Sequence, residues 1–155
     1  MITNTSPLIF LTKIVRLELL RELFDTIIIP QAVYDEITIG EKPGSLEIKK
    51  AVMEGWIKIN KTKIKNDYKL GKGENEAINL AMESNDCVII DDKAAIRVLE
   101  ALKIKHLRTT TIIFMALNKK LITKKEALRM INKLIAEGYY ITPQVYTRIL
   151  ETLKK

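Results

Sequence analysis

Cysteine and histidine are nearly absent from this 155-residue chain, which contains one of each, Cys87 and His106. One cysteine cannot form an internal disulfide, and without further thiols it cannot build a cysteine metal site. The apolar run around Cys87 predicts that it is a small buried residue. A single histidine with no second one beside it argues against a zinc site and against catalysis by His106.

Long apolar runs, internal repeats, low-complexity segments and long linkers are also missing. No apolar run reaches the roughly 18 residues that a membrane span needs. The short run at 8–11 has no basic segment before it, which argues against a signal peptide. With 47% hydrophobic residues, the chain can bury a substantial core as one domain over residues 1–155. We expect a cytoplasmic protein without a membrane partner.

Acidic residues are outnumbered, since 26 lysines and arginines against 19 acids give a formal net charge of +7. This excess favours an anionic partner such as RNA, DNA or an acidic protein. A lysine-rich surface balanced by glutamates would have the same composition. Tyr68 lies in a basic stretch and could stack on a base, but that stretch also fits a solvated linker. Its lysines are Lys58, Lys61, Lys63, Lys65 and Lys69.

Strand and helix patterns alternate along the chain. The apolar runs at 26–29 and 87–90 show no alternation, which is typical of strands covered on both faces. The order predicts an α/β fold with a central parallel sheet of about four or five strands and helices on both sides. The expected strands are 1–3, 26–29, 56–59, 87–90 and 106–108. The expected helices are 7–15, 17–24, 31–37, 45–55, 74–84, 94–102, 110–118, 124–138 and a last one that starts at Thr142–Pro143. Ser6 and Ser45 are the expected N-caps of two of them, and Thr123–Glu126 is predicted to form a capping box.

Polar residues follow several of these strands, where ligands bind in parallel sheets. Asn4 stands at the tip of the first strand, Glu36 follows the second, Glu74 opens a later helix, and Asp91 and Asp92 follow another strand. Carboxylates that converge there could bind Mg²⁺ or Mn²⁺, which prefer oxygen ligands. Such ions neutralise phosphate charge and activate water. The pattern therefore predicts a metal-dependent hydrolase, with an amide in place of the first carboxylate.

Each acid also has a local explanation. Since Asp91 and Asp92 are neighbours, we expect one to face the site and the other to cap the next helix; both could also serve the turn alone. Glu74 shares its helix face with later apolar residues, which places it at the boundary of the core. Glu74 could also simply interact favourably with the helix dipole, as acids in a first helical turn do. Glu36 by itself is weak evidence for a metal site.

Hydroxyl groups and arginines could complete the site. Thr5 and Ser6 could hydrogen-bond a metal-bound water or a ligand side chain, but Ser6 fits an ordinary N-cap equally well. Arg97 and Arg108 could contact RNA phosphates, or each could form a surface salt bridge.

Three segments together resemble the PIN domain, specifically the small prokaryotic PIN-like proteins related to VapC toxins. They are Asn4–Ile9, Ile28–Glu36 and Gly73–Ile78, and the last is followed by Ile90–Ala95. Their order and separations make the resemblance fairly specific, and it covers nearly the whole chain. It implies a three-layer α/β nuclease that binds Mg²⁺ or Mn²⁺ through acids at the carboxyl edge of the sheet.

By position, the acids of that family fall on Asn4, Glu36, Glu74 and Asp92. The resemblance makes these four the catalytic set. The metal ligands that it implies are Glu36, Glu74 and Asp92, with Asp91 as the alternate to Asp92.

Three further residues would support this set. The hydroxyl that the family carries near its first acid would be Ser6 or Thr5, and Glu76 is the nearby rival of Glu74. Asn4 departs from the family's aspartate. A neutral amide can ligate a hard cation through its carbonyl oxygen, but it weakens the metal site by one charge.

The leading hypothesis is a Mg²⁺- or Mn²⁺-dependent ribonuclease that is the toxin of a toxin–antitoxin pair. RNA, a second copy of the chain and a small antitoxin protein are the partners that the resemblance implies. An alternative is a PIN-like module that binds RNA or protein without cutting. A third is a receiver-like domain, which would need a lysine after a late strand. Lys105 instead stands before His106, at the start of a weak strand.

Overall fold

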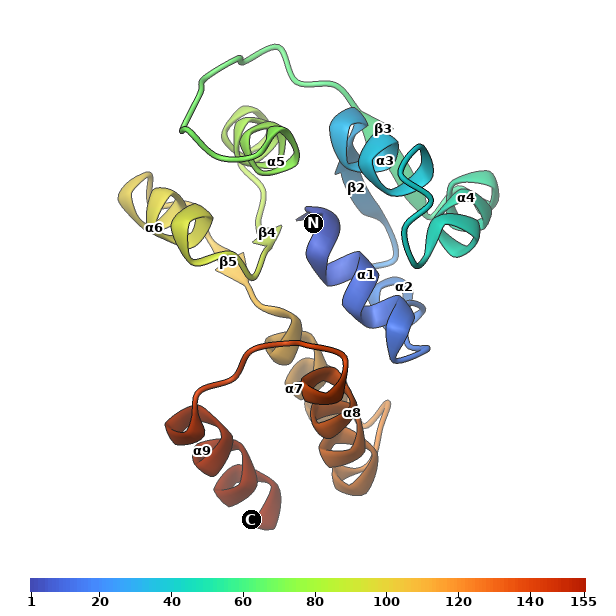
Figure 1. The fold of residues 1–155 in the computed structure, drawn as a ribbon, viewed down its shortest axis with the longest axis vertical. Helices are drawn as coiled ribbons and strands as arrows, with labels where there is room; N and C mark the ends of the chain where they lie inside the picture. Colours follow the sequence, from blue (N-terminus) through green and yellow to red (C-terminus); the bar gives the residue numbers. More distant parts are fainter.

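The protein is described by a computed structural model over all residues, 1–155. Its five strands form one parallel sheet in the order β3-β2-β1-β4-β5, with nine helices around it (Figure 1), which confirms the predicted architecture. The strands are β1 (Ile2–Thr3), β2 (Ile27–Pro30), β3 (Ile57–Asn60), β4 (Val88–Ile89) and β5 (His106–Leu107). The helices are α1 (Thr5–Lys13), α2 (Leu19–Phe24), α3 (Gln31–Thr38), α4 (Ser45–Glu54), α5 (Lys72–Ser84), α6 (Lys93–Ala101), α7 (Thr109–Asn118), α8 (Lys124–Ala136) and α9 (Pro143–Lys154).

Two clusters of buried apolar side chains fill the space on the two sides of the sheet. The larger cluster, of 27 residues, joins β2 and β3 to α1, α2, α7 and α8. The smaller one, of 10 residues, packs α5 and α6 against β1 and β4. Side chains alternate along β4 and the residue that follows it, so Val88 and Ile90 belong to the smaller cluster and Ile89 to the larger. The sheet is therefore the middle of three layers.

Several predicted helix caps are confirmed. Thr123 and Glu126 form the capping box of α8, with both reciprocal hydrogen bonds present. The side chain of Thr142 caps α9 at the backbone N–H of Val145. The side chain of Asp92 caps α6 at the N–H of Ala95, 2.8 Å away, so this is the acid of its pair that caps the helix.

Helices α1 and α5 each begin two residues earlier than the sequence predicted, α6 and α7 begin one residue earlier, and α4 differs at its cap. Helix α1 starts at Thr5, and Asn4 occupies the N-cap position with no side-chain hydrogen bond, so the prediction of Ser6 as N-cap was wrong. Helix α5 starts at Lys72, which places Glu74 at its third residue. Gly44 (φ +96°) precedes α4, and Ser45 is already helical. The prediction of Ser45 as N-cap was therefore also wrong, and the other four helices include residues that were predicted to precede them.

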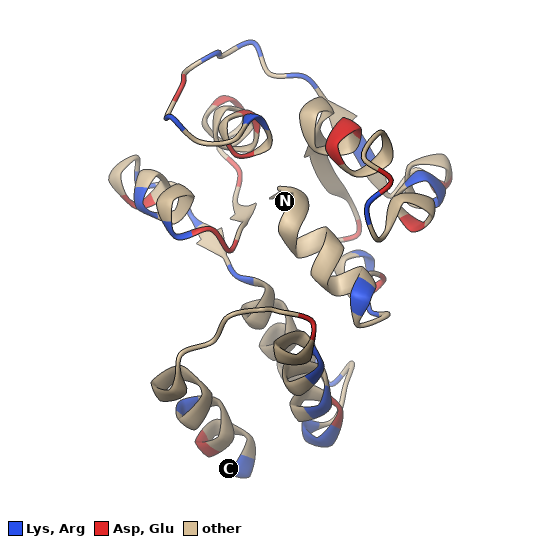
Figure 2. Ribbon diagram, viewed as in Figure 1, with Lys and Arg blue, Asp and Glu red and all other residues tan.

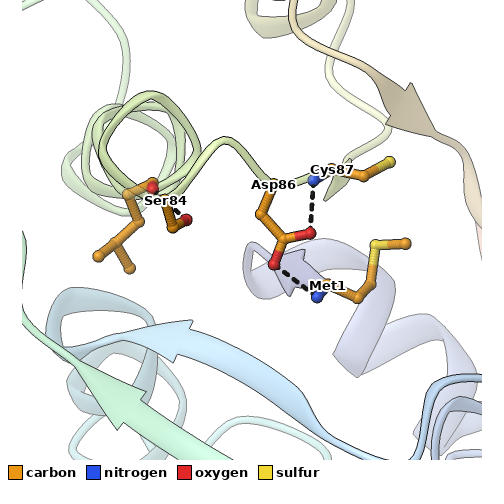
Figure 3. A network of polar contacts seen from close by, with 5 residues as sticks. Met1, Ser84, Asp86 and Cys87 are labelled. Carbon is orange, nitrogen blue, oxygen red and sulfur yellow. Dashed lines mark hydrogen bonds and ion pairs between the residues drawn. The ribbon is translucent and has the colours of Figure 1, made fainter.

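The amino ends of β1 and β4 are joined at the edge of the sheet opposite the predicted site (Figure 3). The amino group of Met1 lies 2.7 Å from Asp86 Oδ2, and Asp86 Oδ1 accepts a hydrogen bond from the N–H of Cys87. Burial, followed by the Asp86 carboxylate, raises the pKa of the Cys87 thiol. Cys87 is half-buried rather than fully buried as predicted. None of the helices combines the length and the apolar character that crossing a membrane requires.

Candidate functional site

The candidate site lies where β1 and β4 end side by side. From the central strand β1, the sheet continues through β2 in one direction and through β4 in the other. This reversal of strand order is the place where open α/β sheets bind ligands. Thr3 pairs with Ile89, and the backbone N–H of Asn4 reaches the Ile89 carbonyl at 3.4 Å. Asn4 and Asp91 therefore leave neighbouring strand ends.

Asn4 is a buried amide without a partner. Its side chain is 1% exposed, and neither Oδ1 nor Nδ2 makes a hydrogen bond. Leaving a buried polar group unpaired costs about 1–3 kcal/mol, so such groups call for an explanation. Because side chains alternate along a strand, Asn4 shares the face of Ile2, which packs toward α5 and α6.

Glu36 is held on one side of the site by α1. The hydroxyl of Thr5 donates a hydrogen bond to Glu36 Oε2. Gly73 lies on the other side of this carboxylate, since a Cβ atom there would stand 3.3 Å from Glu36 Oε2 and 3.2 Å from Val33. The absent side chain at Gly73 lets the start of α5 approach α3. Of the two partners considered for the Thr5 hydroxyl, a bound water or a side chain of the site, the structure shows a side chain, that of Glu36.

Asp91 has both of its carboxylate oxygens occupied. Oδ1 accepts from the N–H of Thr109 at 3.0 Å and from the hydroxyl of Tyr139 at 2.6 Å, and Oδ2 accepts from the Thr109 hydroxyl at 2.6 Å. Burial and the neighbouring Asp91 raise the pKa of Tyr139, so that its hydroxyl stays protonated and donates. Asp91 thus fastens the start of α7 and the connection between α8 and α9 to the end of β4.

Asp92 and Glu74 keep oxygen atoms free. Asp92 uses Oδ2 to cap α6, which leaves Oδ1 without a hydrogen bond. The side chain of Glu74 folds back over Gly71 at the start of α5 and makes no hydrogen bond. Glu74 and Asp92 line one pocket together with Asp91 and Ser6.

Glu76 is engaged elsewhere. One of its carboxylate oxygens accepts a hydrogen bond from the N–H of Ala32 at 3.0 Å, in the first turn of α3. Glu76 therefore joins α5 to α3, and it does not line the pocket that contains Glu74.

The pocket has a volume of about 400 Å³. Besides the acids it is lined by side chains that the sequence reading did not select: Phe10, Lys93, Tyr139 and Tyr140. The sequence feature that could have pointed to the two tyrosines is the break between two helical patterns at Gly138, which places them in a connection between helices. Among the predicted phosphate contacts, Arg108 lines the pocket, whereas Arg97 lies on α6 outside it.

The donor set fits Mg²⁺ or Mn²⁺ in chemistry but forms no finished cluster. The structure brings no three Asp, Glu, His or Cys side chains close enough together to hold a metal ion. Carboxylate and amide oxygens without a hydrogen bond at this edge belong to Asn4, Glu36, Glu74 and Asp92. Both ions prefer oxygen ligands. The buried Asn4 amide has an oxygen atom without a hydrogen-bond partner, which a bound ion would provide.

The segment between β3 and α5 forms an arch that carries several basic residues (Figure 2). Its lysines Lys61, Lys63, Lys65 and Lys69 are exposed, as is Lys58 in β3. Tyr68 does not share this exposure. Its hydroxyl donates to Asn79 Oδ1 at 3.2 Å, and its ring packs against the smaller core cluster. Asn79 also donates to the carbonyl of Asn66. Tyr68 therefore anchors the arch to α5, and its ring is not presented for stacking on a base.

Comparison with known protein families identifies the family of this chain. The sequence model of a family described as a PIN domain matches residues 1–155. Neither the curated proteins nor the solved structures gave a match to the chain. Since the match spans all of the residues that carry this sheet and its edge, the chain belongs to the PIN-domain family.

Proposed function

We propose that this protein is a Mg²⁺- or Mn²⁺-dependent ribonuclease. The observation that carries the proposal is the buried, unpaired amide of Asn4 at the end of β1, where the strand order of the sheet reverses. Leaving this amide unpaired costs folding stability. A bound ligand that pairs with it would explain why it is there. The PIN domain is a nuclease-type fold, and the net charge of +7 suits a polyanionic substrate.

We assign the residues of the site different roles in phosphodiester cleavage. A divalent ion at this edge would neutralise charge on the phosphate and lower the pKa of a bound water. Asn4, Glu74 and Asp92 would hold the ion, with Glu36 oriented by Thr5. Asp91 would act by fixing the position of the site, because its own oxygens are already occupied.

Two cations are placed to hold the RNA backbone. Lys93 and Arg108 line the same pocket as Glu74 and Asp92, and neither forms an ion pair with a carboxylate. Their charges are therefore free to bind phosphate. With a neutral Asn4, the site attracts a cation less strongly than one with an aspartate there, so we expect weak metal binding and slow cleavage.

We propose further that the protein is the toxin of a toxin–antitoxin pair, of the VapC kind, and that it forms a homodimer blocked by a small antitoxin protein. The support for this extension is the resemblance of the three sequence segments. A pull-down with the product of a short neighbouring reading frame, followed by loss of cleavage in the complex, would test it.

A second candidate function is a PIN-like module that binds RNA without cutting it. The absence of any group of three clustered metal-binding side chains favours this alternative. The neutral Asn4 favours it as well.

Cleavage of a labelled single-stranded RNA in Mn²⁺, in Mg²⁺ and in chelator tests these proposals. Asp92→Asn keeps a good N-cap for α6 while it removes the charge. Its rate should fall at least about 100-fold, as expected when one electrostatic group at a reacting phosphate is lost. Glu100→Gln is the matched control, because Glu100 is an exposed carboxylate on the same helix. Asn4→Asp should raise both Mn²⁺ affinity and rate.

The outcomes separate the two candidate functions. Cleavage by the unaltered chain that needs the ion and Asp92 supports the ribonuclease. Cleavage by Asn4→Asp alone would mean that the scaffold is a nuclease silenced at one position. If no variant cuts and RNA still binds in chelator, the nuclease proposal is wrong and the binding module stands.

A further inference from the structure

The connection between α8 and α9 presents one tyrosine to solvent beside the candidate site. Gly138 adopts φ +95°, a left-handed conformation that glycine reaches without strain, and it ends α8. After this turn Tyr139 faces inward and is 7% exposed, whereas the next residue, Tyr140, is 69% exposed. No other aromatic side chain of the protein belongs to the exposed large hydrophobic residues.

Tyr140 stands on a rigid support. The ring of its neighbour Tyr139 packs edge-on against Phe10 of α1, with ring centroids 5.1 Å apart. The hydroxyl of Tyr139 donates to Asp91 at 2.6 Å, where the connection passes the end of β4 (Figure 1). Tyr139 is thus fixed at both ends of its side chain, so the backbone that carries Tyr140 is held in place.

Two hollows meet at Tyr140. The pocket of about 400 Å³ that contains Glu74 and Asp92 lies on one side. A second pocket of about 390 Å³ extends toward the start of α9, over Ile141 and Val145. Both are lined by Lys93, Arg108, Tyr139 and Tyr140. Each is within the range of about 300–1,000 Å³ that is usual for small-ligand sites.

The shared wall of the hollows combines an aromatic face with free positive charge. The Lys93 Nζ atom lies 5.4 Å from the centre of the Tyr140 ring, and Lys93 and Arg108 have no acidic partner. Exposed aromatics beside unpaired cations are how proteins bind single-stranded nucleic acid: the ring stacks on a base and the cations hold the backbone. A duplex hides the faces of its bases, so it cannot use such a platform.

We propose that Tyr140 is a stacking platform for an unpaired base, and that with Lys93 and Arg108 it selects single-stranded RNA and sets its position relative to Asp92. A nucleotide in the second hollow then places its neighbouring phosphate toward the acidic pocket. Only the expected effect of Tyr140 on cleavage rests on the proposed ribonuclease function; its effect on RNA binding does not. Binding in chelator tests the platform independently.

The experiment measures the fluorescence anisotropy of a labelled single-stranded RNA of mixed sequence in chelator. Tyr140→Ala should weaken binding by about 5- to 150-fold, the measured range for one stacked base. Tyr140→Phe should bind as the unaltered chain does, and Tyr140→Leu should resemble alanine because it is apolar but not aromatic. Lys93→Gln should weaken binding, whereas Lys103→Gln, at an exposed lysine outside both pockets, should not.

The proposal would be overturned by unchanged binding in Tyr140→Ala, by equal binding in the leucine and phenylalanine variants, or by a duplex of the same sequence that binds as tightly as the single strand. Competition by a poly-glutamate peptide as strong as that by RNA would also overturn it, because charge alone would then explain binding. If the protein cuts RNA and Tyr140→Ala changes neither binding nor cleavage, the platform fails and the nuclease stands. If RNA binding depends on Tyr140 and no variant cuts RNA, the nuclease proposal fails and the stacking platform stands.

Discussion

Asn4 shows how far a single residue can depart from what folding alone favours. Its amide is buried and unpaired, whereas Asn79, also buried, pairs with Asn66 and Tyr68. The first amide costs stability and the second supplies it. Two asparagines with similar burial therefore have opposite roles, and only the first needs a ligand to explain it.

Asn4→Leu should raise the free energy of unfolding by about 1 kcal/mol, because an apolar group of similar size removes the unpaired amide. The same change should abolish cleavage. Asn79→Leu is the matched control, and it should lower the free energy of unfolding by about 2 kcal/mol, since it removes the hydrogen bonds of a buried amide to Tyr68 and to the Asn66 carbonyl. Urea denaturation measures both. Equal destabilisation by the two changes would show that Asn4 is an ordinary structural residue.

Asp91 is the residue for which the structure suggests a role other than the one implied by the sequence. Asp91→Ala should lower the free energy of unfolding by about 2–4 kcal/mol, since Thr109 and Tyr139 lose their acceptor in the protein interior. Tyr139→Phe should cost about 1 kcal/mol. The double variant should cost less than the sum, because the two residues interact directly. A small loss of stability combined with loss of Mn²⁺ binding would make Asp91 a metal ligand instead.

At the scale of the element, the sequence predicted side-chain caps correctly where a helix begins after a loop. The pairs Thr123–Glu126 and Thr142–Pro143 mark the starts of α8 and α9 in sequence and in structure. Helix α1 was misread because the sequence signal of Ser6 and Pro7 is genuine but lies inside the helix. The helix starts directly after β1, since the chain has to turn there to stay at the edge of the sheet.

The capping box of α8 should make stability depend on pH. Hydrogen bonds from the backbone and side chain of Thr123, with a contribution from Arg16, lower the pKa of Glu126 from 4.5. A carboxyl whose pKa is lower in the folded state stabilises it above the unfolded pKa, and this stabilisation is lost as the pH falls through the folded pKa. The difference in unfolding free energy between the unaltered chain and Glu126→Gln should therefore be present at neutral pH and vanish in acid.

Glutamine can still complete a capping box, so this comparison isolates the charge of Glu126. The control is the same pair of measurements in a Thr123→Ala background, where the dependence on pH should shrink. A difference that is constant from neutral to acid pH would contradict the assignment.

At the scale of the whole molecule, the net charge of +7 predicts RNA binding that is sensitive to salt. If about three phosphates are neutralised, raising the salt from about 50 to about 200 mM should lower the affinity for single-stranded RNA about 20-fold. Arg108→Gln should reduce the slope of this dependence by about 0.7. Arg97→Gln should leave it unchanged, because Arg97 lines neither pocket. Equal effects of the two arginines would mean that the charge acts only as a diffuse field.

The sequence by itself determined the elements and their class. Apolar runs without alternation require strands buried on both faces, and helices between them force parallel connections, so an α/β parallel sheet follows from local pattern. It also placed Asn4, Asp91 and Asp92 at strand ends. These are properties of short segments, which are set by the residues within them.

Only the tertiary structure decided what each of these groups contacts. That Asp91 is occupied by Thr109 and Tyr139, that Tyr68 is fixed to the core, and that Tyr140 stands exposed beside Lys93 all depend on segments far apart in the chain. Long-range pairing selects one hydrogen-bond partner among many that the sequence allows. For the same reason, only the fold could show that Asn4 is buried without a partner.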